Sequence, residues 1–134
     1  MTAELIDETQ DHSTVPITAV QVEMHPLLQQ DELQSYCPEH GMDLVAYAPL
    51  GNGAILDVPE LVEIGEQYDA SAAQVSLAWL REKGAVAIPK ASTKEHIEEN
   101  ITSNDLDLDA AGVEAIDDIG RQDRQYDPDY APEW

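Results

Sequence analysis

Lys90 ends a short apolar run, and Ser92 and Thr93 follow it where a helical pattern begins. The first turn of a helix leaves backbone N–H groups without partners, and the helix dipole places partial positive charge there. A lysine ammonium beside such a helix start adds a full charge, and phosphate groups bind where these features combine. These residues therefore predict a phosphate-binding site at the end of the run.

Three further polar side chains fall on the helix that begins there. His96, Glu99 and Asn100 are spaced at i, i+3 and i+4, so they share one helix face with Thr93 in the first turn. This face either contacts the molecule that carries the phosphate or is an ordinary solvated face, which acidic residues usually form. The spacing alone leaves both interpretations open.

Two earlier apolar runs also end in side chains that suit ligand chemistry. Gln21 carries an amide that donates and accepts at once, and Tyr47 offers an aromatic plane on which a flat ring can stack. A satisfied polar group at a strand end and a core aromatic are the alternatives for these positions. The loop of residues 50–53, with Leu50 and Gly51, is weak evidence for phosphate binding and by itself favours a plain turn.

Metal and thiol chemistry have little support in the sequence. Glu23 and His25 alternate on one strand without a third ligand, so a pair that lines the interior is favoured over a metal site. Cys37 is the single cysteine, which excludes an internal disulfide, and a buried thiol is favoured over a nucleophile. We assign neither a metal site nor a catalytic residue from these patterns.

Three apolar runs must position the candidate side chains. Residues 15–22, 42–48 and 85–89 are bounded by turn or cap residues, and the second and third lack clean alternation, as strands buried on both faces of a parallel sheet do. Helices are expected at residues 1–12, at 31–40 with Asp31 as cap, at 59–68 after Pro59, from a Ser71 cap to Gly84, at 92–102 with Ser92 and Glu95 as a capping box, and from an Asp109 cap to Gly120. The alternation predicts an α/β fold with parallel strands, although a flavodoxin-like sheet would show a similar pattern.

The charge balance is strongly acidic, with 28 Asp and Glu against 6 Lys and Arg and a formal net charge of -22. The chain lacks the basic surface that nucleic acids and anionic membranes require. Dispersed acidic surfaces occur in proteins that work in concentrated salt, so we hypothesise a halophilic source. No apolar run is long enough to span a bilayer and no secretion signal is recognisable, so a cytoplasmic location is expected.

Four blocks of sequence resemble one enzyme family. Residues 21–26 (QVEMHP) are similar to the sixth-strand signature of aldo-keto reductases, with Val20 in place of the usual Asn. Residues 46–51 (AYAPLG) resemble the end of the seventh strand, and residues 73–80 (AQVSLAWL) continue the match. Residues 88–93 (IPKAST), with Glu99 and Asn100, resemble the eighth-strand motif. Four blocks in this order are hard to obtain by chance, and the resemblance covers residues 15–119.

The resemblance implies that the chain is a single domain, residues 1–134, from a (β/α)8 barrel. It would hold about three C-terminal parallel strands with their helices and an extended arm at residues 121–134. A nicotinamide cofactor is also implied, with Gln21 paired to its carboxamide, Tyr47 stacked on its ring, and Leu50 and Gly51 near its pyrophosphate. The adenosine and its 2′-phosphate would contact the residues from the third run onward: Lys90, Ala91, Ser92, Thr93, His96, Glu99 and Asn100.

Two departures from the family pattern weaken the implied 2′-phosphate site. His96 stands where the family commonly has an Arg, so an imidazole replaces a guanidinium fork. Ala91 replaces a Ser that can contact the phosphate. Because Lys90 remains, we expect NADP(H) in preference to NAD(H).

The resemblance implies NADP(H)-dependent reduction of aldehydes and ketones by the full-length protein. The family's Tyr general acid, with the Lys, Asp and His that assist it, comes from earlier strands, and none of those motifs occurs in this sequence. We therefore expect this chain to carry cofactor-binding motifs without the catalytic residues. The alternatives are a non-catalytic truncated piece and one part of a two-chain assembly, completed by an N-terminal half-barrel or by self-association.

Overall fold

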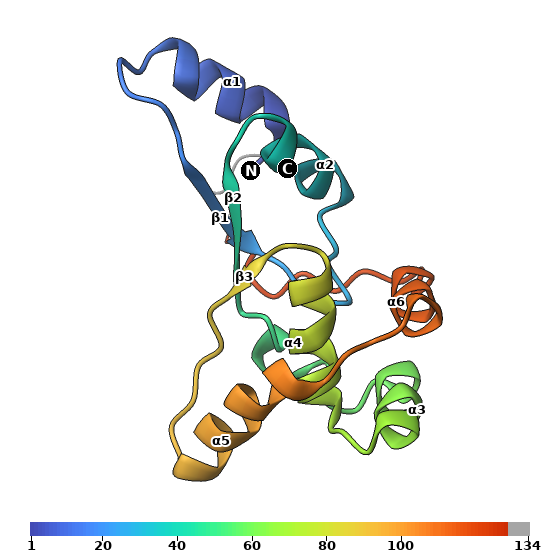
Figure 1. The fold of residues 1–134 in the computed structure, drawn as a ribbon. Coiled ribbons are helices and arrows are strands. Elements are labelled where there is room, and N and C mark those ends of the chain that lie inside the picture. The colour runs from blue at the N-terminus through green and yellow to red at the C-terminus, as the bar shows by residue number, and fades with distance from the viewer. Residues whose placement is uncertain (129–134) are drawn as a thin grey trace.

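Three parallel strands, β1 (Ala19–Glu23), β2 (Asp43–Tyr47) and β3 (Val86–Ala87), lie side by side in chain order (Figure 1). The computed structural model describes residues 1–128 of the chain. β1 and β2 pair along their whole length, whereas β3 pairs with β2 over two residues. Because the strands are parallel, their carboxyl ends meet at one edge of the sheet. The predicted α/β architecture is confirmed.

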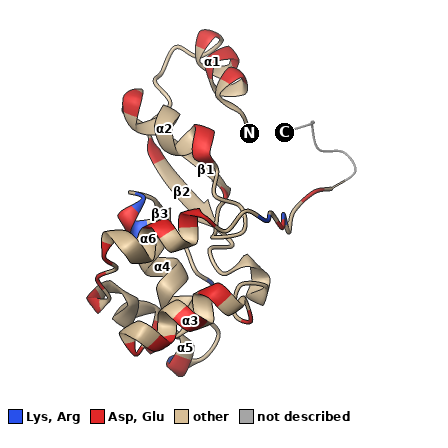
Figure 2. Ribbon diagram, turned by 90° about the vertical axis from the view of Figure 1, so that its right-hand side faces the viewer, with Lys and Arg blue, Asp and Glu red and all other residues tan. Residues whose placement is uncertain are grey.

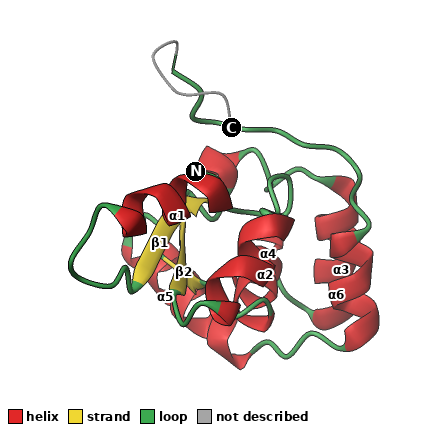
Figure 3. Cartoon of the chain, turned by 90° about the horizontal axis from the view of Figure 1, so that it is seen from above, coloured by secondary structure: helices red, strands yellow, loops and turns green. Residues whose placement is uncertain are grey.

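Helices connect and cover the strands. Their bounds are α1 (Ala3–Asp11), α2 (Asp31–Glu39), α3 (Pro59–Tyr68), α4 (Ala72–Glu82), α5 (Lys94–Thr102) and α6 (Ala110–Asp117), with 3-10 turns η1 (Gly51–Gly53) and η2 (Ser103–Asp105). Figures 1 and 3 show α2 and α4 on one side of the sheet, with α3 and α6 farther from it. None of the helices in the described part of the chain is long and apolar enough to cross a membrane.

The core lies between the sheet and α4. This helix is buried at eight of its eleven residues, including the fully buried Trp79, because other elements surround it. Burial along β1 and β2 alternates, so Val20 and Leu44 face the core while Ala19 and Gln21 are exposed on the opposite face. The strands are thus covered on one face within this chain. Only the second and third runs were expected to form strands buried on both faces, and this expectation is wrong for this chain, because Asp43 of β2 and Val86 of β3 are exposed.

All three predicted strands are longer than the observed ones, and the two outer strands differ most. Residues 15–18 are not strand, because Gln10 of α1 binds this stretch through its side chain, donating to Val15 O at 3.1 Å and accepting from Ile17 N at 2.7 Å. At the other end of the sheet, Ile88 N donates to Ala46 O at 3.1 Å, and Pro89 has no N–H with which to continue the pairing.

Two of the predicted helix caps are confirmed. Ser71 and Gln74 form a capping box at the start of α4, and Asp109 Oδ1 accepts from Gly112 N at 2.8 Å at the start of α6. The last helix stops at Asp117, three residues before the predicted Gly120, because Asp118 already forms its C-cap.

Two predicted caps are wrong by one residue. The cap of α5 is Thr93, whose Oγ1 accepts from His96 N at 3.2 Å, so Ser92 lies outside the helix and no capping box with Glu95 can form. The cap position of α2 is held by Gln30 in the left-handed region, with φ 62° and no side-chain cap bond. Its side chain donates instead to Glu23 O at 2.7 Å, so Asp31 becomes the first helical residue.

Acidic residues cover the helices, as Figure 2 shows, while basic residues are few. Repulsion among surface charges opposes folding until salt screens it, and the screening length falls to about 3 Å in molar salt. We therefore expect the melting temperature to rise by about 5 °C or more between about 0.05 M and 2 M KCl, a change of roughly 1 kcal/mol for a domain of this size. Circular dichroism melts at several protein concentrations would separate screening, which is independent of concentration, from association. A flat dependence on KCl would contradict the halophile hypothesis.

Candidate functional site

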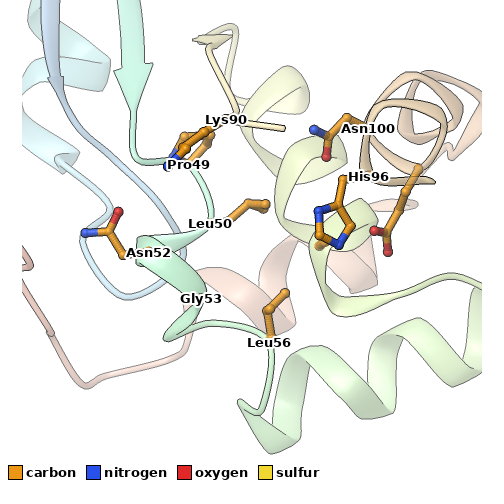
Figure 4. A pocket seen from close by; sticks show the side chains of 10 residues that line it. Pro49, Leu50, Asn52, Gly53, Leu56, Lys90, His96 and Asn100 are labelled. Carbon is orange, nitrogen blue, oxygen red and sulfur yellow. The ribbon is translucent and has the colours of Figure 1, made fainter. Parts of the chain in front are cut away.

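A cavity of about 430 Å³ lies between the loop that follows β2 and the helix α5 (Figure 4). Figure 4 shows His96 and Asn100 projecting from α5 toward the loop that carries Leu50 and Leu56. The residues that line it are Pro49, Leu50, Asn52, Gly53, Leu56, Ala73, Lys90, His96, Glu99 and Asn100. The structure therefore brings together five of the residues predicted to bind the cofactor, from two segments that lie about forty positions apart in the sequence.

The loop wall depends on backbone conformations that favour glycine. Gly51 is buried with φ 52°, and a Cβ at this position would approach Ile55 Cγ2 to 3.3 Å. The loop is tied to α4 because Ser76 Oγ donates to Pro49 O at 2.8 Å. Gly51 thus shapes the wall without lining the cavity, so the loop is both a tight turn and part of the site.

The opposite wall is held by contacts between α5 and α4. Ser71 Oγ donates to Glu99 Oε1 at 2.5 Å, and Gln74 Nε2 donates to Thr102 Oγ1 at 2.9 Å. Glu99 and the neighbouring Asn100 are half-buried, which rejects a purely solvated face for this part of the helix. The start of α4 therefore fixes where the α5 residues stand in the cavity.

The connection from β3 to α5 places charge at the cavity. Lys90 supplies the positive charge among the lining residues, and it is exposed. Ala91, Ser92 and Thr93 follow Lys90 without lining the cavity, and Thr93 Oγ1 is engaged as the helix cap. Lys90 is therefore the one residue of the 90–93 segment that lines the cavity, and phosphate binding by Lys90, by the start of α5 and by the three connecting side chains remains a prediction.

The other two predicted residues, Gln21 and Tyr47, lie elsewhere. They line a second cavity of about 200 Å³, together with Met1, Val22, Glu23, Gln30 and Arg124. Burial raises the pKa of the Tyr47 hydroxyl, and the nearby charge of Glu23 raises it further, so this ring stays neutral at neutral pH. The predicted residues thus form two groups, which suits a long ligand with chemically different ends.

Two residues near Tyr47 escaped the sequence analysis. Tyr126 packs edge-on against the Tyr47 ring with centroids 5.5 Å apart, and its hydroxyl donates to Asn52 Oδ1 at 3.2 Å. Arg124 lines the second cavity. Both follow the last helix in a stretch without periodicity, and the only sequence signal was that Arg121 and Arg124 are two of the chain's six cations.

The metal and thiol interpretations can be compared with the geometry. Glu23 and His25 are buried and bonded to each other, with Nε2 and Oε1 2.9 Å apart. Within residues 1–128, no group of three His, Cys, Asp or Glu side chains is arranged to hold a metal ion. Cys37 is buried, and burial raises the pKa of its thiol, which disfavours a thiolate nucleophile.

The sequence of this chain is similar to those of known proteins. The family model described as "Aldo/keto reductase family" matches residues 1–121. Glyoxal reductase of Bacillus subtilis is 39% identical over 104 residues, which cover 78% of this chain and 38% of that protein. The chain thus spans well under half the length of this relative.

Solved structures show the same likeness. A putative 2,5-diketo-D-gluconic acid reductase B superposes with a TM-score of 0.92 at 31% identity, covering 100% of this chain and 49% of that one. An aldo-keto reductase complexed with NADPH superposes with a TM-score of 0.86 at 29% identity, covering 96% and 42%. The fold is therefore part of a (β/α)8 barrel, as predicted. With the family model matching most of its residues, this chain belongs to the aldo/keto reductase family of oxidoreductases.

Proposed function

We propose that this chain forms the NADP(H)-binding part of an aldo-keto reductase that reduces small aldehydes and ketones. The observation that carries the proposal is the cavity in which Lys90 and the α5 residues His96, Glu99 and Asn100 face the loop after β2. Relatives named glyoxal reductase and methylglyoxal reductase, and a neighbour complexed with NADPH, support this reaction class and this cofactor.

Each end of the cofactor has a matching group of residues in this proposal. Lys90 and the start of α5 hold the 2′-phosphate, and the adenosine lies in the 430 Å³ cavity. The nicotinamide lies at the second cavity, where Gln21 pairs with the carboxamide and the Tyr47 ring supports one face. NADPH supplies the hydride when bound, and this chain's own residues bind and orient it.

Lys90→Ala tests the proposal through the phosphate end of the cofactor. We expect the affinity for 2′-phospho-AMP to fall at least about tenfold, because a hydrogen bond to a charged group is typically worth about 1.5–3 kcal/mol. The affinity for 5′-AMP, which lacks the 2′-phosphate, should change little. Isothermal titration calorimetry with both nucleotides would measure the two effects.

Lys94→Ala is the matched control for this experiment. Lys94 lies four residues farther on, is 88% exposed, pairs with Glu98 and does not line the cavity. The Lys94→Ala variant removes the same positive charge close to Lys90. It therefore measures how much the overall charge of this region affects nucleotide binding. Equal losses in both variants, or tight binding unchanged in Lys90→Ala, would reject the proposed phosphate site.

A further inference from the structure

The carboxyl group of Glu23 is buried at the end of β1, with 1% of the residue exposed. Its Oε1 accepts from Gln125 N at 2.7 Å and faces His25 Nε2 at 2.9 Å, while its Oε2 accepts from Tyr126 N at 2.9 Å. Three donors around one buried carboxyl group satisfy it in the way that a buried charge requires. Two of these donors belong to backbone about 100 residues farther along the chain.

The segment that Glu23 binds has no regular structure of its own. The arm was predicted at residues 121–134, of which 129–134 lie outside the described part of the chain, and its described residues 121–128 contain neither helix nor strand. The arm is tied down at its start by the paired hydrogen bonds from Arg121 to Glu60, both 2.7 Å, and by Asp123 N donating to Leu27 O at 2.8 Å. Farther along the arm, the Glu23 carboxyl group accepts hydrogen bonds from the backbone N–H groups of Gln125 and Tyr126.

The position of the Tyr126 side chain follows from these backbone contacts. Once its N–H is fixed on Glu23, its ring lies edge-on to Tyr47 and its hydroxyl reaches Asn52 of the loop beside the larger cavity. One residue of the arm therefore touches a residue from each cavity lining. Tyr126 itself is 46% exposed, so packing alone does not hold it there.

We propose that Glu23, supported by His25, is a positioning residue that anchors the arm and thereby fixes Tyr126 against Tyr47. If Glu23 and His25 only filled space in the core, both carboxyl oxygens of Glu23 would not need to accept hydrogen bonds from backbone N–H groups of the arm. The His25 ring supports Glu23 from the other side, and its Nδ1 has no hydrogen-bond partner among the described residues. Replacing the Glu23 carboxylate therefore disturbs one connected set of contacts.

Trypsin reports the anchoring directly, because Arg121 and Arg124 lie in the arm and the amide after Arg124 is bound to Glu23. In Glu23→Gln one acceptor oxygen becomes an NH2 group, which opposes an arm N–H instead of accepting from it. We expect cleavage after Arg124 to become about tenfold faster, the effect of losing one charge-assisted hydrogen bond in a locally opening segment. Cleavage after Arg81 in α4 and after Lys83, the C-cap of α4, should stay unchanged.

Two further variants keep the test decisive. Glu66→Gln removes the same charge from an exposed position on α3 and should leave cleavage after Arg124 unchanged. Tyr126→Pro removes the other arm donor, the N–H that binds Glu23 Oε2, while leaving Glu23, the core and the Arg124–Gln125 bond intact, and it should expose the arm even if Glu23→Gln proves unstable. Unchanged cleavage after Arg124 in both Glu23→Gln and Tyr126→Pro would overturn the anchor.

The effect on Tyr47 rests on the proposed function and has its own readout. With reduced nicotinamide mononucleotide as the probe, Tyr126→Ala and Glu23→Gln should each weaken binding about threefold or more, since an aromatic contact is worth roughly 0.5–1.5 kcal/mol. Binding of 2′-phospho-AMP should not change. Loss of both probes in Glu23→Gln would indicate general unfolding and overturn the positioning role, while a wild-type chain that binds neither probe would reject the proposed function and leave the trypsin result to decide the anchor.

Discussion

The isolated chain is expected to oxidise no NADPH in the presence of small aldehydes or ketones. Carbonyl reduction needs a proton donor beside the hydride, and cofactor binding alone cannot replace it. Tyr36 donates to Asp7, which raises the pKa of Tyr36 to about 12, and Tyr68 donates to Asp109, which also raises its pKa. A general acid works best when its pKa lies near the working pH, and the pKa values of both hydroxyls lie well above neutral pH.

The tyrosines near the cavities are no better suited. Tyr47 is the residue proposed to support the nicotinamide ring, and burial raises the pKa of its hydroxyl. The Tyr126 hydroxyl is already engaged as the donor of a hydrogen bond to Asn52 Oδ1. Among the residues that line the two cavities the only lysine is Lys90, which stands at the proposed phosphate end of the cofactor.

The measurement is the loss of NADPH absorbance with a panel that includes glyoxal and methylglyoxal. A complete family member assayed in parallel shows that the panel and the buffer support turnover. Turnover by this chain that exceeds a blank, rises in proportion to protein and disappears in Tyr47→Phe would contradict the expectation and place the proton donor within these residues.

Local signals in the sequence were sufficient where the physics is local. The Ser71 and Asp109 caps involve atoms three residues apart, and both were predicted correctly, although the reciprocal bond with Gln74 that completes the capping box was not predicted. The cap of α5 was misplaced because Ser92 and Thr93 are adjacent and either hydroxyl can cap a helix. Sequence alone does not decide between neighbours of equal propensity.

The contacts that sequence reasoning missed join distant segments. Glu23 meets Gln125 and Tyr126 across about 100 residues. A shorter-range contact was also missed, in which the Gln10 side chain binds the backbone of Val15 and Ile17 ahead of β1. None of these contacts has a periodicity or a spacing that a single sequence can show. By contrast, the motif blocks were enough to predict that Leu50, Lys90 and the α5 residues share one site. Each of these motifs follows a strand, and the carboxyl ends of the strands lie at the same edge of the sheet.

Association is the second large effect that the structure predicts. Within the described residues, β1 and β3 each pair only with β2, so each has one edge whose N–H and C=O groups meet no further strand. The face opposite the helices exposes Val86 at 52% and Ile88 at 46%. Such edges and apolar surface tend to pair with another chain, and the net charge of -22 opposes this in dilute buffer.

We therefore expect the isolated chain to be oligomeric in about 2 M KCl, where screening leaves the apolar face to control association. Co-expressed with the N-terminal half of a family member, it should instead form a compact one-to-one complex, because that half supplies strands for both open edges. Light scattering coupled to size-exclusion chromatography would measure both masses. The matched control is Val86→Lys, which places a charge on the open face and should reduce self-association without touching the cavities. A monodisperse, cooperatively melting monomer in concentrated salt, with no complex on co-expression, would mean that the open edges are stable as they stand and that no second half completes the sheet.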